Sequence, residues 1–187
     1  MNKIFSAGIV LAVMMLMGPS AALATGPASL YKVRVSLFEL YNGTSWVTIF
    51  SGTSTTLDIA AASSGSAAGS FFAGQTVPDG VYTQSRVTVS PVFIISGRDG
   101  ASYTRATNGP GSGCTTGAAA QEASCTITLT GGNVPTAETH DFSSTPITVQ
   151  NGAADHKVRV SFDVSNSIQL NAGELFPAAP TVTMSLQ

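Results

Sequence analysis

The fold class is decided by Lys32-Val33-Arg34-Val35-Ser36, a stretch in which valines alternate with polar residues. Successive side chains of a β-strand point to opposite faces, so this period of two predicts a strand with its valines in the core. The same five residues recur as Lys157-Val158-Arg159-Val160-Ser161, and Arg86-Val87-Thr88-Val89-Ser90 repeats the alternation more loosely. We expect three half-buried strands of an all-β fold.

A hairpin is predicted directly after the first of these strands. The alternation shifts its phase at Leu37-Phe38, which indicates a β-bulge before Leu40. Asn42-Gly43 then marks a tight turn, because a type I′ turn needs positive φ at both central residues and Asn and Gly tolerate it. Residues 45–50 are therefore expected to pair back on the first strand.

Further short strands follow along the rest of the chain, separated by Gly and Pro turns. They are expected at residues 56–59, 92–95, 103–107, 125–130, 139–142, 147–149, 158–164 and 181–186. Pro91 cannot donate a ladder hydrogen bond, so the strand before it is expected to reach a sheet edge or a bulge there. No stretch has the period of a helix. The pattern predicts a single antiparallel β-sandwich of roughly eight to ten short strands.

The N-terminal residues 1–24 have the three parts of a secretory signal peptide: Lys3, the apolar run Ile4–Met17 and small residues at Ser20–Ala24. We expect cleavage after Ala24 and no membrane span afterwards, since the apolar run is short for a bilayer. A retained anchor is the alternative. Residues 25–187 are expected to form one exported domain with a flexible Ala/Ser/Gly-rich loop at 60–74, located outside the cell or at its surface, with the periplasm as the alternative.

Composition and cysteine content agree with an exported protein. Charged residues make up 10% of the chain and the formal charge is −2, so there is no general attraction to nucleic acid or anionic membranes. Cys114 and Cys125 are the two cysteines, and exported chains oxidise such pairs. We expect a structural disulfide that stabilises the fold by about 3 kcal/mol in the chain-entropy model.

The sequence shows no catalytic or metal-binding motif. It lacks a Gly-x-Ser-x-Gly elbow, a phosphate-binding loop ending in Lys-Ser or Lys-Thr, and a His-Glu-x-x-His helix. His140-Asp141 and Asp155-His156 place an imidazole beside a carboxylate, but neighbouring residues on a strand point to opposite faces. We expect no catalytic residue, metal or cofactor, and therefore no enzyme.

Two motifs in the chain resemble elements of known domains. Val77-Pro78-Asp79-Gly80-Val81-Tyr82-Thr83, leading into residues 86–89, resembles the Pro-x-Gly-x-Tyr turn and strand of secreted bacterial sandwich domains of the immunoglobulin-like and transthyretin-like kinds. Residues 158–168 are similar to the closing strand of one group of these domains. The resemblance implies a fold, a compartment and roles from surface adhesion to carbohydrate binding. It transfers no functional residues.

The first functional hypothesis is a structural or adhesive protein, a subunit of a filament or other surface assembly. Val182, Met184 and Leu186 alternate in the last strand, and residues 181–187 carry neither the charge nor the proline that usually protects an edge. Such a strand favours self-association, or pairing with other surface proteins, by strand addition. An ordinary strand covered within the monomer is the alternative.

The second hypothesis is a binding module for carbohydrate or another small extracellular ligand. Sugar sites usually expose aromatic rings, and Trp46 lies across the predicted turn from Tyr41. Cross-strand packing of the two rings is the alternative interpretation.

Four basic residues form a third candidate feature. If the valines of the repeated strands point inward, Lys32, Arg34, Lys157 and Arg159 project outward. On neighbouring strands they would form one basic stripe, suited to an acidic polysaccharide, extracellular nucleic acid or the acidic face of another subunit.

Overall fold

The computed structural model describes residues 25–61 and 75–186, and almost all of its regular structure is antiparallel β-strand. Within these residues 18 strands form five sheets, and the helical elements are two 3₁₀ turns, η1 (Ala119–Gln121) and η2 (Gly131–Asn133). The all-β class is confirmed, whereas a single sandwich of eight to ten strands is not. None of the described residues forms a helix long and apolar enough to cross a membrane. The predicted signal peptide, and residues 62–74 of the predicted loop, lie outside the described residues.

The five sheets are defined by their strand order. The largest is β1 (Thr25–Gly26), β16 (Ile168–Asn171), β17 (Glu174–Pro177), β10 (Cys114–Gly117) and β9 (Tyr103–Asn108). Two sheets have four strands: β11 (Cys125–Thr128), β8 (Val92–Gly97), β2 (Ala28–Val33) and β5 (Leu57–Asp58); and β12 (Glu138–Asp141), β7 (Gln84–Val89), β3 (Val35–Tyr41) and β4 (Trp46–Ser51). The smaller ones are β14 (Ala153–Ala154), β13 (Ile147–Gln150) and β6 (Gly80–Tyr82); and β15 (Val158–Asp163) with β18 (Thr181–Leu186).

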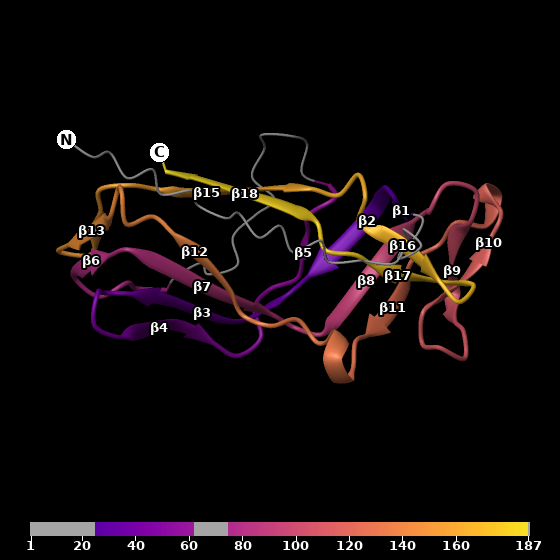
Figure 1. The fold of residues 1–187 in the computed structure, drawn as a ribbon, viewed down its shortest axis with the longest axis horizontal. Coiled ribbons are helices and arrows are strands. Elements are labelled where there is room, and N and C mark those ends of the chain that lie inside the picture. Colours follow the sequence, from indigo (N-terminus) through magenta and orange to yellow (C-terminus); the bar gives the residue numbers. More distant parts are fainter. Residues whose placement is uncertain (1–24, 62–74, 187) are drawn as a thin grey trace, which may run out of the picture.

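Two long strand segments cross from one four-stranded sheet to the other. The first is β2 and β3, interrupted at Arg34, and the second is β7 and β8, interrupted at Ser90 and Pro91. Because β2 pairs with β8 and β3 pairs with β7, the segments form one long antiparallel pair along the molecule (Figure 1). The Ser90 amide donates to the Arg34 carbonyl at 2.8 Å, which connects the two interruptions. Pro91 lies in this break, where no ladder hydrogen bond is required of it.

The hairpin predicted after the first strand is present, but its turn differs from the prediction. Strands β3 and β4 pair with a register shift between Phe38 and Glu39, which is the expected bulge. The connection contains four residues, and Gly43 alone among them has a positive φ, of 88°. The Asn42 side chain accepts hydrogen bonds from the backbone amides of Thr44 and Ser45 at 3.0 and 2.9 Å. An Asx-type turn therefore replaces the type I′ turn.

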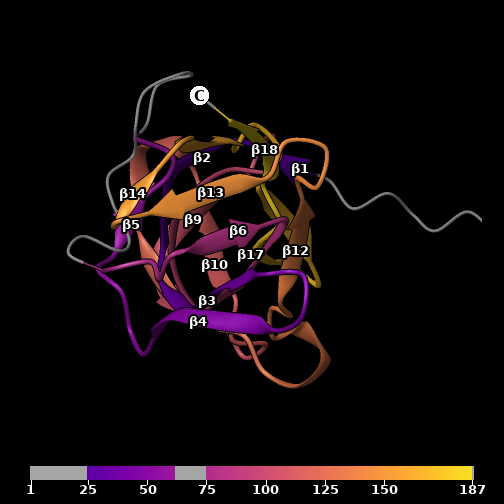
Figure 2. The same cartoon turned by 90° about the vertical axis from the view of Figure 1, so that its left-hand side faces the viewer.

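The buried apolar residues form two clusters. One cluster surrounds Tyr31, Ile95 and Ile127 and includes the disulfide, and the other surrounds Leu40 and Tyr82. Fully burying one isoleucine or leucine side chain stabilises the folded state by about 1.5–3 kcal/mol. Viewed along the long axis, β3 and β4 lie on the opposite side of the molecule from β13 and β18 (Figure 2).

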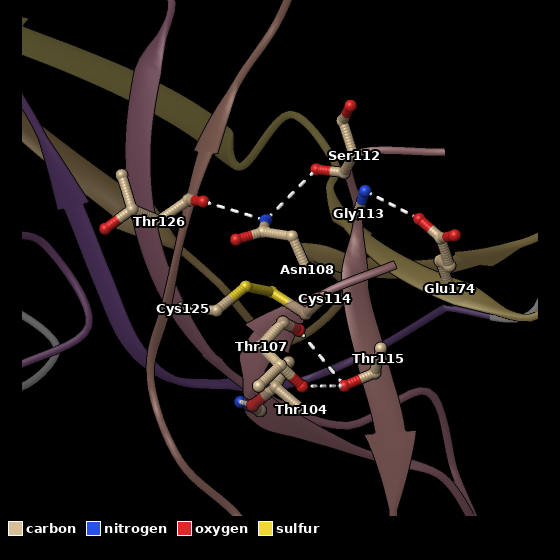
Figure 3. Close-up of a disulfide and its surroundings, with 11 residues drawn as sticks. Thr104, Thr107, Asn108, Ser112, Gly113, Cys114, Thr115, Cys125, Thr126 and Glu174 are labelled. Carbon is tan, nitrogen blue, oxygen red and sulfur yellow. Dashed lines mark hydrogen bonds between the residues drawn. A yellow bond between two sulfur atoms is a disulfide. The ribbon is translucent and has the colours of Figure 1, made fainter. Parts of the chain in front are cut away.

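The predicted disulfide joins Cys114 on β10 to Cys125 on β11 and so connects two sheets (Figure 3). Both cysteines are buried, and their Cα atoms lie 6.0 Å apart. The glycine-rich loop before Cys114 wraps around the buried Glu174 carboxylate, which accepts hydrogen bonds from the amides of Gly111 and Gly113 at 2.8 and 2.7 Å. A Cβ on Gly113 would come within 2.6 Å of the Phe176 ring, so this close approach requires glycine.

Candidate functional site: an apolar groove under the β15–β18 ribbon

A groove of about 1260 Å³ runs along the inner face of the long strand pair. Its volume exceeds the roughly 300–1,000 Å³ of typical small-molecule pockets. The ribbon formed by β15 and β18 covers it and contributes Val160, Phe162 and Val182 to its wall. On the strand pair, the apolar lining includes Val33, Val35, Leu40, Val87, Val89 and Phe93.

The period-two alternation of the sequence builds this lining. Ser85, Val87 and Val89 are two residues apart on β7, so their side chains share one face and all three line the groove. On β15, Val160 and Phe162 have the same spacing. Val160 is 38% exposed, because it faces the groove rather than a packed core.

One end of the groove contains a buried hydroxyl. Ser85 is 2% exposed, and its Oγ has no hydrogen-bond partner among the described residues. His140 on β12 lies directly opposite Ser85 and also lines the groove, and Leu40 lies opposite Ser85 on its other side. A buried polar atom without a partner costs about 1–3 kcal/mol. The Ser85 hydroxyl therefore lowers the stability of the fold.

Two basic residues, Lys157 and Arg159, border the same end of the groove. They alternate with Val160 and Phe162, so their side chains leave the opposite face of β15. Strand β15 starts directly after β14, and β14 pairs with β13. Strand β13 also pairs with β6, which directly precedes β7. The start of β15 therefore lies near the start of β7 (Figure 1). Glu138 is the acidic residue of the lining, and it lies opposite Val87, further along the groove than His140.

The structure separates His140 from its sequence neighbour Asp141, as the alternation predicted. His140 lines the groove, while Asp141 accepts hydrogen bonds from Ser143 and from the Gln84 amide group. The hydrogen bonds from the Ser143 side chain and backbone, followed by that from Gln84, lower the pKa of Asp141. Among the described residues no group of three or more His, Cys, Asp or Glu side chains is placed to hold a metal ion.

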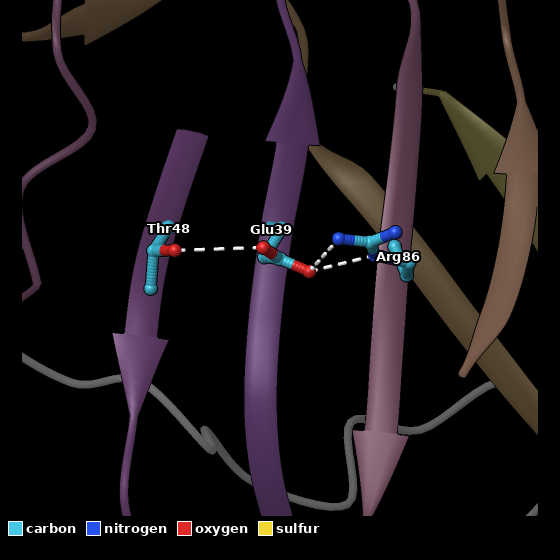
Figure 4. Close-up of polar contacts among 3 residues, drawn as sticks. All are labelled: Glu39, Thr48 and Arg86. Carbon is cyan, nitrogen blue, oxygen red and sulfur yellow. Dashed lines mark hydrogen bonds and ion pairs between the residues drawn. The ribbon is translucent and has the colours of Figure 1, made fainter. Parts of the chain in front are cut away.

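The predicted aromatic pair is present but lies outside the groove. The rings of Tyr41 and Trp46 have centroids 5.2 Å apart, as cross-strand neighbours on β3 and β4. The Arg86 guanidinium lies 4.3 Å from the Trp46 ring centroid and forms an ion pair with the buried Glu39 (Figure 4). Part of the Trp46 ring is thus engaged by Arg86, an arrangement typical of cation–π packing.

The four basic residues of the repeated motif are divided into two pairs. Strand β2 pairs with β8 and β5, and among the described strands β15 pairs only with β18, so the two copies are not neighbours in a sheet. Arg34 donates from Nε to Thr56 Oγ1 at 2.6 Å, and neither Lys32 nor Arg34 lines the groove. Lys157 and Arg159 do line it.

Sequence reasoning did not identify Ser85 as a site residue. The signal was present, because Ser85 has the same phase as Val87 and Val89 and is therefore a polar residue on an apolar face. His140 was considered only with Asp141, and its position opposite Ser85 depends on the pairing of β12 with β7.

Fold and site together define an all-β protein with a groove whose walls are mainly apolar. The chain matches no family model, no curated protein and no solved structure. The resemblance of its two motifs to secreted sandwich domains stays a prediction. Any function must be argued from the site itself.

Proposed function

We propose that this protein is an exported, non-enzymatic binding protein that holds an apolar ligand in the groove. The observation that carries the proposal is a groove of about 1260 Å³ with mainly apolar walls. Protein interiors are close-packed, with few voids larger than a water molecule. A space of this size between sheets is therefore suited to a ligand.

The lining has the composition of a binding site. Apolar surface removed from water contributes roughly 25 cal/mol per Å², so valine and phenylalanine walls supply affinity for an apolar ligand without directional contacts. A few polar groups then fix its orientation. His140 is such a group, since it lines the groove and is partly exposed.

The disulfide supports the exported location. Disulfides persist in oxidising compartments and are rare in the cytosol. Cys114 and Cys125 form one here, in agreement with the predicted signal peptide. We place the protein outside the cell or at its surface, with the periplasm as the alternative.

Fluorescence titration with a neutral apolar dye, N-phenyl-1-naphthylamine, tests the function. Val160→Trp should obstruct the groove from the ribbon and weaken dye binding by about tenfold or more, because buried apolar contacts are lost. The matched control is Thr183→Trp, an exposed ribbon residue next to Val182 that does not line the groove. Absence of dye binding to the unmodified protein, or equal effects of the two variants, would overturn the proposal.

A second function, assembly by strand addition, is favoured by the ribbon. Among the described strands, β18 pairs only with β15, so its other edge is open to a strand from a second chain. Light scattering and negative-stain microscopy of concentrated protein test this function. Regular assemblies would support it, and single particles at every concentration would oppose it.

A further inference from the structure

The sheet formed by β12, β7, β3 and β4 has an outer face that points away from the groove. Leu40 lines the groove, so the alternation of β3 directs its neighbour Tyr41 to this outer sheet face. A straight row of four side chains crosses the face, each opposite the next: Asp141 on β12, Gln84 on β7, Tyr41 on β3 and Trp46 on β4. Neighbouring strands lie about 4.8 Å apart, so the row extends over roughly 14 Å.

The two aromatic rings of the row are held in place and remain partly exposed. The Tyr41 and Trp46 ring centroids lie 5.2 Å apart, and the rings are tilted by 49°. The Arg86 guanidinium, anchored by its ion pair with Glu39, lies over one side of the Trp46 ring. Both aromatic residues are nevertheless only half-buried. The remaining ring surface is therefore available for contact with a ligand.

Polar groups adjoin the rings along the same row. Gln84 Nε2 donates to Asp141 Oδ2 at 2.9 Å, which fixes both side chains and leaves the Gln84 carbonyl oxygen as an acceptor. The Tyr41 hydroxyl and the Trp46 indole N–H donate no hydrogen bond to another described residue. A sugar ring offers apolar C–H groups on its flat faces and hydroxyls around its rim, so aromatic rings beside donors and acceptors complement it.

The charge of the outer sheet face excludes a strongly acidic ligand. Arg86 contributes one positive charge, but the ion pair with Glu39 neutralises it, and Asp141 adds a negative charge to the row. An acidic polysaccharide would meet this carboxylate with unfavourable electrostatics. A neutral sugar would not.

We infer that the outer sheet face binds a neutral polysaccharide. Sugar rings pack on the accessible surfaces of Trp46 and Tyr41, and their hydroxyls form hydrogen bonds with Gln84 and Asp141. This site lies on the opposite face of the sheet from the groove. It is therefore a second binding site, independent of the proposed function.

Affinity electrophoresis in native gels that contain a soluble polysaccharide tests the inference. At least one neutral polysaccharide among hydroxyethylcellulose, xyloglucan and galactomannan should retard the unmodified protein, whereas alginate, which is acidic, should not. Absence of retardation by all three neutral polysaccharides would overturn the inference. Retardation by alginate alone would overturn it as well, because the ligand would then be acidic.

Two variants and a matched control locate the site. Trp46→Ala should weaken polysaccharide binding by about tenfold or more, because the largest stacking surface is lost. Gln84→Ala should weaken it by about threefold or more through the loss of a hydrogen-bonding group, and it preserves the aromatic packing. The control is Tyr103→Ala, which removes another half-buried aromatic ring with an arginine over it, Arg98, from β9 in a different sheet.

The control variant should bind as tightly as the unmodified protein. Equal retardation of Trp46→Ala, Gln84→Ala and the unmodified protein would overturn the outer sheet face as the site. Dye titration of the same variants separates the two sites, since neither Trp46 nor Gln84 lines the groove. We expect their dye affinity to stay within about twofold of the unmodified protein.

Discussion

Ser85 on β7 lies directly opposite His140 on β12, and both side chains line the apolar groove. The Ser85 hydroxyl is buried and unpartnered among the described residues, so it opposes folding. The relationship can be tested by removing the hydroxyl.

Ser85→Ala should raise the free energy of unfolding of the ligand-free protein by about 1 kcal/mol, because the desolvation penalty of the hydroxyl disappears. The same change should leave dye binding within about twofold, because the hydroxyl is not accessible from the groove. Urea denaturation and dye titration measure the two effects.

The control for this prediction is Ser167→Ala. Ser167 is the other buried hydroxyl without a partner among the described residues, and it does not line the groove. It should stabilise the protein to a similar extent and leave binding unchanged. A loss of stability in Ser85→Ala would show that the hydroxyl has a partner in solution.

Removal of the disulfide by Cys114→Ser with Cys125→Ser should lower the free energy of unfolding by about 3 kcal/mol. The main cause is the higher conformational entropy of the unfolded chain without the cross-link. The bridge closes an 11-residue separation and connects β10 to β11. Urea unfolding of the variant, compared with the unmodified protein in the presence and absence of reductant, measures this effect. If reduction destabilised the double variant as well, the loss could not be attributed to the bridge.

The Glu39–Arg86 ion pair should contribute to the stability of the β3–β7 pairing. The Glu39 side chain is 9% exposed, and its Oε2 accepts from Arg86 Nε at 2.6 Å. Arg86→Met should lower the free energy of unfolding by about 2 kcal/mol, because it leaves a nearly buried carboxylate without its partner and removes the contact with Trp46.

Glu39→Gln in the Arg86→Met background provides the matched test for this pair. It should recover part of the lost stability, since a neutral amide costs less to bury than an unpaired carboxylate. Chemical denaturation of the four proteins of the double-mutant cycle gives the coupling energy. A coupling energy near zero would contradict the prediction.

Strand positions were predictable where the alternation is local. Lys32–Ser36 predicted a strand, and Val33 is buried as expected. The identical repeat also forms a strand, yet Val160 is 38% exposed. A local pattern therefore predicts strand geometry, while burial depends on which partner strands meet it. The change of sheet at Arg34 likewise depends on distant pairing and leaves no local signal.

The β16–β17 hairpin was missed because its turn lacks the usual signals. Ala172 has a φ of 50°, a conformation that alanine rarely adopts, and Gly173 alone marks the turn. Strand β10 was missed because Cys114–Gly117 shows no apolar alternation. The disulfide was predictable, since compartment and cysteine count sufficed. The groove was not predictable, because it results from the placement of the ribbon over the long strand pair.

Lowering the pH should weaken the hydrogen bonds between the turn that precedes β6 and the turn that joins β13 to β14. The Asp79 carboxylate accepts hydrogen bonds from the backbone amides of Gly152 and Asn151 at 3.1 and 3.0 Å. These bonds, first that from Gly152, lower the pKa of Asp79 below its usual value of 3.8. Because the folded state holds the lower pKa, the contribution is fully present above about pH 4 and is lost as the pH falls through the folded-state value.

Asp79→Asn should therefore reduce the fall in the free energy of unfolding as the pH becomes acidic. Urea midpoints measured between neutral and strongly acidic pH should fall less steeply for Asp79→Asn than for the unmodified protein, since one proton fewer is taken up on unfolding. Asp99→Asn is the control: the Asp99 side chain accepts a local hydrogen bond from the Ser102 amide and does not join the two turns. Identical acid limbs for Asp79→Asn and the unmodified protein would show that the carboxylate does not hold the turns together in solution.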